Sequence, residues 1–187
     1  MQSLDDNDCL ERYRQGDANA LSELVEHYRR PLFSFILRMT ERRDDADEIF
    51  QEVWFRAIRN LPDYHNRQFS SWLFRITHNL IIDRGRRRKN EVSIDEDDGA
   101  QQIAGKDRSP AETLQDRDMH KRIRKAVDDL PGEQREVFMM RMDAGLPFKE
   151  IASIQQTSIN TALARMTYAL DKLKSALADD YAMINQR

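Results

Sequence analysis

The sequence contains few of the residues that build disulfides and tight turns: one Cys, six Gly and five Pro in 187 residues. A single cysteine cannot close an internal disulfide, which fits a reducing cytoplasm. Cys9 lies near the N-terminus among polar residues, so we expect it to be exposed and incidental. The long stretches without Gly or Pro favour helices. The four histidines and the one cysteine show no metal-ligand spacing, so we expect no metal site and no cofactor.

Long apolar runs are also missing. No segment approaches the roughly 18 apolar residues that a membrane-spanning helix needs. Residues 1–6 lack the basic and apolar regions of a signal peptide. We therefore expect no membrane insertion and a cytoplasmic location.

Positive charge is most concentrated in one short run. The whole chain has 30 Lys and Arg against 33 Asp and Glu, a formal net charge of -3, yet residues 84–89 read RGRRRK. A basic patch on an otherwise acidic protein indicates a polyanionic partner at one surface.

Residues 92–112, VSIDEDDGAQQIAGKDRSPAE, interrupt the helical pattern on both sides. Sparse apolar residues and many Asp, Gly and Ser predict a solvated linker. We expect an all-α fold of two small helical domains joined by a flexible acidic linker, because no β-strand is needed anywhere. The predicted bounds are 1–90, 91–112 and 113–187.

Apolar residues spaced by three and four predict the helices of the N-terminal domain. Pro31 should kink or split the first, and Pro62 should end the second. Ser70 or Ser71 can cap the third, after a loop at 63–68. The three ranges are about 21–36, 46–61 and 70–83.

The C-terminal domain ends in a short helix, a brief turn and a longer helix, which is the helix-turn-helix pattern. The helices are predicted at about 119–130, 133–143, 148–154 and 159–178, with Gly145 as the stop of the second. Short polar groups and an arginine on the last helix suit a major groove, although a plain bundle helix is the alternative. The outward positions are Asn160, Thr161, Ala164, Arg165, Tyr168 and Lys172.

Two surfaces of the N-terminal domain are candidate sites. The polar face of helix 46–61 is either an ordinary solvated face or a docking surface for a basic protein, and composition alone does not choose. Amide, imidazole and aromatic groups between 63 and 79 could bind the bases of an opened strand while the arginines neutralise phosphates. A solubilising basic tail is the alternative there. The acidic face comprises Asp44, Asp47, Glu48, Gln51, Glu52 and Arg56; the second surface comprises His65, Asn66, Arg67, Phe69, Arg75, His78, Asn79, Arg84, Arg86, Arg87 and Arg88.

Three motifs together resemble one family, the group 4 or extracytoplasmic-function (ECF) bacterial RNA polymerase sigma factors. Residues 45–54, DADEIFQEVW, resemble the core-polymerase-binding helix called region 2.2. Residues 69–79, FSSWLFRITHN, resemble the promoter-melting segment. Residues 130–131, 134–138, 145–146 and 149–152 resemble region 4. The resemblance covers the chain from about Ala18 to Leu177.

The resemblance implies a role for each surface. Asp47, Glu48, Gln51 and Glu52 would dock on the β′ coiled coil of core RNA polymerase. The sigma4 helix-turn-helix would place Arg165 and its neighbours in the major groove of the −35 element and touch the β flap. The linker would thread toward the RNA exit path, and an anti-sigma factor would hold the protein inactive. The −10 contacts would be His65, Asn66, Phe69, Arg75, Asn79, Arg84, Arg86 and Arg87.

The chain departs from the family pattern in three places. Residues 161–165 read TALAR where the family often has TVKSR, so a lysine is lost and the upstream element is read differently or more weakly. Gln155 and Gln156 occupy a turn that usually contains Gly, which costs on the order of 1 kcal/mol in a left-handed conformation. Glu48 stands where Asp is more usual.

Two other functions compete with that of a promoter-specificity subunit. A free-standing helix-turn-helix regulator would need neither an acidic docking helix nor the aromatic segment after it. An enzyme acting on nucleic acid would need a carboxylate or histidine constellation, and the acidic clusters at 44–52 and 95–98 have no His or Cys at ligand spacing. We therefore expect no catalysis.

Overall fold

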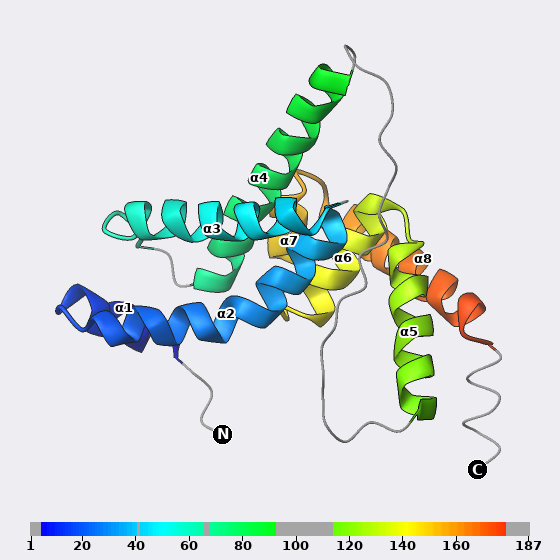
Figure 1. The fold of residues 1–187 in the computed structure, drawn as a ribbon, viewed down its shortest axis with the longest axis horizontal. Helices are drawn as coiled ribbons and strands as arrows, with labels where there is room; N and C mark the ends of the chain where they lie inside the picture. The colour runs from blue at the N-terminus through cyan, green and yellow to red at the C-terminus, as the bar shows by residue number, and fades with distance from the viewer. Residues whose placement is uncertain (1–4, 41, 66–67, 93–113, 179–187) are drawn as a thin grey trace. The chain divides into compact units, whose positions relative to one another are not determined.

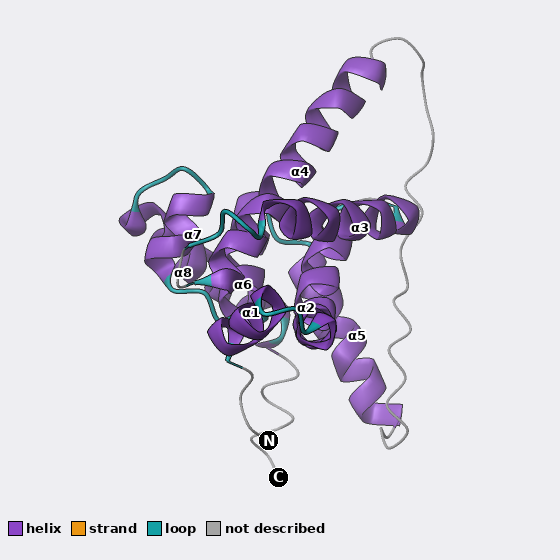
Figure 2. Cartoon of the chain, turned by 90° about the vertical axis from the view of Figure 1, so that its left-hand side faces the viewer, coloured by secondary structure: helices purple, strands orange, loops and turns teal. Residues whose placement is uncertain are grey.

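The computed structural model describes residues 5–40, 42–65, 68–92 and 114–178, and every regular element in these ranges is a helix (Figures 1 and 2). This confirms the predicted all-α class. No helix in the described ranges is long and apolar enough to cross a bilayer. Most of the predicted linker, from residue 93 on, lies outside the described residues.

The chain divides into two compact units, residues 1–103 with 143–146 and residues 104–142 with 147–187. The described residues of the first unit form four helices, which are α1 (Asp6–Arg14), α2 (Ala18–Met39), α3 (Arg43–Asn60) and α4 (Phe69–Val92). The second contains α5 (Leu114–Asp128), α6 (Gly132–Met142), α7 (Phe148–Ile154) and α8 (Ile159–Ala176).

The first unit is held by an aromatic and aliphatic core between α2, α3 and α4. Leu24, Leu32 and Ile36, which belong to the predicted apolar stripe of α2, are fully buried, and so is Phe35, which was not predicted. Pro31 lies inside α2 and does not split it. Packing of the flanking buried residues stabilises the helix across the missing backbone donor.

α1 was not predicted from the sequence, because its composition is almost wholly polar. Asp5 caps it by accepting a hydrogen bond from the Asn7 N–H at 2.9 Å, and acidic residues in the first turn suit the helix dipole. Cys9, a residue of this helix, is buried, so the expectation that it is exposed was wrong. Burial raises the pKa of its thiol, and nearby Glu23 raises it further, which disfavours the reactive thiolate form.

The second unit packs α8 against α5, α6 and α7. Its core is aliphatic, with Val137, Met140, Ile151 and Ile154 buried against Ala162 and Ala169 of α8. Gly145 has φ +65° shortly after α6, which agrees with the predicted stop, although α6 itself ends at Met142. The predicted bounds of α7 match the structure.

Candidate nucleic-acid and protein interfaces

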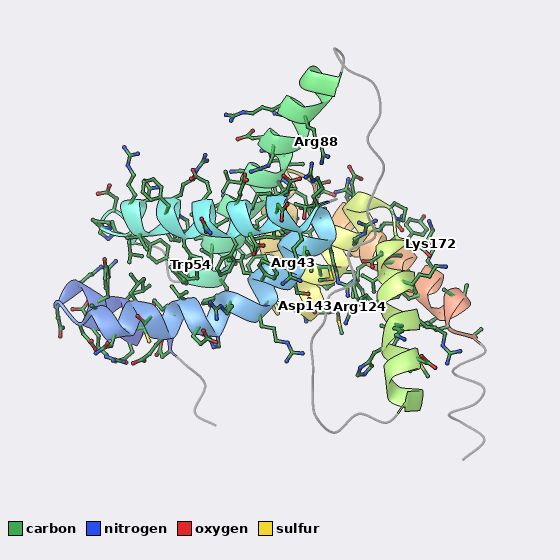
Figure 3. All side chains as sticks on the ribbon, in the orientation of Figure 1. Arg43, Trp54, Arg88, Arg124, Asp143 and Lys172 are labelled. Atoms are coloured by element: carbon green, nitrogen blue, oxygen red, sulfur yellow. The ribbon has the colours of Figure 1, made fainter. Side chains whose placement is uncertain are left out.

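α3 separates its apolar and acidic residues onto two faces. Ala46, Ile49, Val53 and Trp54 are buried, and Trp54 lies between α2 and α3 (Figure 3). The outer face carries the predicted docking residues Asp47, Glu48 and Gln51, all exposed, and half-buried Glu52. Glu52 accepts a hydrogen bond from Arg56 at 2.7 Å.

Arg84 of α4 reaches across to this acidic face. Its guanidinium donates to Asp45 at 3.0 Å and also to Glu48, and Arg88 lies 3.4 Å from the second oxygen of Asp45. The hydrogen bond to Glu48 is the main cause that raises the pKa of Arg84. The predicted docking helix and the predicted basic run are therefore joined by ion pairs, which spacing along the chain did not indicate.

The basic run is the last part of a helix, not a tail. α4 continues to Val92, about two and a half turns beyond the predicted end at Asp83. The four-residue spacing of Arg84 and Arg88 turns both toward α3, while Arg86 and Arg87 are exposed. In Figures 1 and 2 this part of α4 extends beyond α3. The arginines best placed for phosphate are therefore Arg86 and Arg87, whereas Arg84 is paired with carboxylates of α3.

Phe69 is buried, so the expectation that it lies on the outer surface as an exposed stacking group is wrong. Its side chain is only 1% exposed. Ring centroids of Tyr28, Trp72 and Tyr64 lie 5.5, 5.6 and 5.8 Å from its own. Burying a phenylalanine side chain stabilises the fold by about 1.5–3 kcal/mol. In the absence of a bound strand, the buried placement of Phe69 is therefore favoured over an exposed one. Ser70 and Ser71 lie inside α4, so neither caps it.

The loop before α4 is held in place by buried Tyr64. Tyr64 is buried, its ring lies 4.6 Å from that of half-buried Trp72, and burial raises its pKa to about 12. The backbone carbonyl of Tyr64 accepts a hydrogen bond from Arg14 of α1. His65 is exposed beside it, whereas Asn66 and Arg67 lie outside the described residues. The outer face of α4 presents Arg75 and Asn79, one turn apart and both exposed.

α7, a turn and α8 form the predicted helix-turn-helix. Gln156 has φ +53°, so a non-glycine residue occupies the left-handed position, as the sequence suggested. Ser158 caps α8: its hydroxyl oxygen accepts from the Thr161 N–H at 3.0 Å. The inward face was predicted to consist of Ala162, Met166, Ala169, Leu173 and Leu177; the first four are buried, whereas Leu177 follows the helix and is half-buried. Asn160, Ala164, Tyr168 and Lys172 are exposed and Thr161 is half-buried; Figure 3 labels Lys172.

Arg165 is fastened within its own unit, although the sequence predicted that it faces outward. It donates to Gln155 at 2.8 Å and to Glu133 of α6, and its side chain is 20% exposed. Gln155 in turn donates to the buried carboxylate of Glu136. Sequence reasoning missed this chain of contacts, because its members are 10 to 32 positions apart.

Two family profiles match the chain. Sigma-70 region 2 matches residues 24–91, which include α3 and nearly all of α4. Sigma-70, region 4 matches residues 120–173, which include the helix-turn-helix. The two profiles thus cover both candidate interfaces, in the order in which the motifs occur.

Three curated relatives match along nearly their whole length. The ECF RNA polymerase sigma factor SigW of Bacillus subtilis is 26% identical over 178 residues, which cover 91% of this chain and 95% of SigW. The RNA polymerase sigma-H factor of Pseudomonas aeruginosa is 27% identical and covers 92% and 93%. The ECF RNA polymerase sigma-E factor of Escherichia coli is 26% identical and covers 92% and 94%.

Two solved structures share the fold. The sigma factor RpoE, in complex with the anti-sigma factor NepR from Bartonella quintana, has a TM-score of 0.72 at 19% identity and covers 84% of this chain and 96% of that one. CnrH, in complex with the cytosolic domain of CnrY, has a TM-score of 0.65 at 22% identity and covers 95% and 99%.

Proposed function

This chain belongs to the extracytoplasmic-function group of the sigma-70 family, and from that premise we propose which of its surfaces bind core RNA polymerase, the promoter and a regulator. It is a sigma factor that binds core polymerase and directs it to promoters. The observation that carries this conclusion is the joint presence of region 2 and region 4 in one chain. A free-standing helix-turn-helix regulator is not favoured, because it would leave the region 2 match unexplained.

The proposed domains are sigma2 at 1–90, a linker at 91–112 and sigma4 at 113–187. The polymerase-binding residues are Asp47, Glu48, Gln51 and Glu52 on the outer face of α3, opposite the β′ coiled coil. Their exposure and negative charge support this assignment, since charge complementarity steers association and sets register. Sigma4 is proposed to touch the β flap.

The proposed −10 surface combines the loop before α4 with the outer face of α4. His65 and Asn79 are exposed there and can hydrogen-bond base edges, and Arg86 and Arg87 can neutralise phosphates further along the helix. The −35 surface is the exposed side of α8, with Asn160 near its N-terminus and Lys172 later.

An anti-sigma factor is proposed as the regulator, because the similar sigma factor RpoE was solved in complex with the anti-sigma factor NepR. Sigma-70 relatives are transcription initiation factors, and we propose that this chain likewise contributes no catalytic group. Its proposed site of action is the cytoplasm, where bacterial polymerase and chromosome meet.

Run-off transcription tests the function as a whole. The full chain is mixed with core polymerase and a library of promoter fragments, and transcripts are sequenced. Initiation from a defined subset with shared upstream and downstream elements is expected. Initiation that is no more selective than that of core polymerase alone would contradict the assignment.

Charge reversal on α3 tests the docking surface. Glu48→Lys with Gln51→Lys should weaken binding to core polymerase at least tenfold, because like charges across an interface cost several kcal/mol. Asn19→Lys with Glu26→Lys makes the same charge change on exposed positions of α2 and should leave binding nearly intact. Since Glu48 also holds Arg84, Gln51→Lys alone separates docking from the loss of that ion pair. Unchanged affinity of the first pair in a quantitative pull-down would remove the assignment.

A further inference from the structure

The N-terminal part of α8 presents almost no charge. Residues 158–164 read SINTALA. The hydroxyl of Ser158 caps the helix and lies 2.8 Å from that of Thr161, so these two polar groups are engaged with each other. Arg165, the first cation, is turned to Glu133 and Gln155. The part of a recognition helix that enters the groove is therefore not built to attract phosphate.

Large apolar side chains are exposed at the same place. Ile159 is 45% exposed and Leu163 is 42% exposed, one helical turn apart on one flank of α8. Exposed Asn160 and Ala164 lie next to them on the outward side. Leu163 is also the position where the sequence departs from a more usual lysine.

The major groove has a partner for this combination. The C5-methyl group of thymine is its apolar feature, and an asparagine side chain pairs in bidentate fashion with adenine. We propose that Leu163, supported by Ile159, contacts a thymine methyl group, so that the upstream element bound by α8 carries a T·A pair at that position. This inference rests on the proposed role of α8 as the recognition helix. It makes Leu163 a specificity-determining residue.

Deoxyuridine isolates the methyl group, because it keeps every hydrogen-bonding group of thymine and lacks only that methyl. The probe is an upstream-element duplex selected by the holoenzyme from randomised DNA. Each thymine is replaced in turn by deoxyuridine, and the affinity of the holoenzyme is measured by fluorescence anisotropy. We expect at least one position at which the loss of the methyl weakens binding about fourfold, the effect of one buried methyl group.

The Leu163→Ala variant completes the cycle. It should bind the thymine and deoxyuridine duplexes equally at that position, because without the leucine side chain the methyl group has no partner to lose. Leu170→Ala changes a comparably exposed leucine further along α8 and should keep the fourfold difference. Circular dichroism checks that both variants fold.

Two results would overturn the proposal while leaving the function of α8 intact. Either no thymine position responds to loss of its methyl, or Leu163→Ala keeps the same response, and in both cases salt-dependent duplex binding persists. If Leu163→Ala weakens only assembly with core polymerase, the apolar flank binds protein and the proposal is wrong. If the holoenzyme selects no upstream duplex at all, the recognition-helix role fails and the inference falls with it.

Discussion

Arg84 and Arg165 are both predicted from the sequence to contact DNA. In the structure each is bonded to side chains of its own unit, but in a different way. Arg84 is 40% exposed and pairs with Asp45 and Glu48 at the surface of α3. Arg165 is half as exposed, and its partner Gln155 is itself held by buried Glu136. Water and ligands can compete for the exposed ion pairs of Arg84. The hydrogen bond of Arg165 is supported by a second one, from Gln155 to buried Glu136.

The exposure of its bonded partners determines whether an arginine near a proposed nucleic-acid surface can move to a phosphate. An exposed ion pair is worth at most about 1 kcal/mol, so a phosphate can replace the carboxylate at little cost. A guanidinium held by an amide that is held in turn by a buried group must break several contacts to move. Arg84 can therefore change partners, and Arg165 acts chiefly as a fastener of the helix-turn-helix.

The largest expected effect is that of Arg165→Ala. Removal of the guanidinium should lower the free energy of unfolding of the chain by about 1–2 kcal/mol, because Gln155 loses its partner. Duplex binding upstream should fall, while opening of a pre-melted template stays mostly intact. Urea denaturation and anisotropy measure the two effects. Arg165→Lys is a second useful variant, because lysine keeps the positive charge but lacks the planar guanidinium that can donate to two partners at once. Unchanged stability in both variants would break the comparison.

A smaller effect is expected when Arg84 is released. Asp45→Asn with Glu48→Gln removes both carboxylates and should raise nonspecific duplex affinity, with a slope of log affinity against log salt steeper by about one. Asp44→Asn with Asp47→Asn makes the same charge change at exposed positions of α3 that are not paired with Arg84. If both pairs change the slope equally, Arg84 gains no phosphate, and its ion pairs are only a fastener.

The smallest effect concerns Gly85, directly after Arg84. A methyl group built at this glycine meets nothing within 4 Å. Gly85→Ala should therefore stabilise α4 by about 0.5–1 kcal/mol, the usual gain of alanine over glycine inside a helix. Thermal unfolding measures it. A loss of stability would mean that α4 needs to bend beside Arg84, and it would contradict a regular helix at this position.

Local pattern predicted most of the helices and little of their contacts. The three- and four-residue spacing identified α2, α3 and the first part of α4, and Gln156 was singled out because the family that the chain resembles usually has Gly in that turn. The polar composition of α1 hid it, since periodicity detects apolar faces only. Its cap Asp5 was the available indication.

The errors at the site share one physical cause. Whether Phe69 faces inward depends on Tyr28 and Tyr64, which come from another helix and a loop. Likewise the partners of Arg84 lie 36 and 39 positions away. An aromatic ring and a guanidinium each suit a base, a phosphate or a neighbouring helix, so residue type alone leaves these roles open until the tertiary contacts are known.

α4 also behaves as a ruler. Its 24 residues run without a break from Phe69 to Val92, a rod of about 36 Å at 1.5 Å per residue. That length corresponds to about ten steps of a duplex with a rise of about 3.4 Å. Asn79, at the proposed point of strand capture, and Arg87, at the proposed grip on the backbone, lie on this one rod. Their eight-residue separation is set by the rise of the helix at about 12 Å, roughly three to four duplex steps, so the protein would fix where opening begins by distance as well as by base sequence.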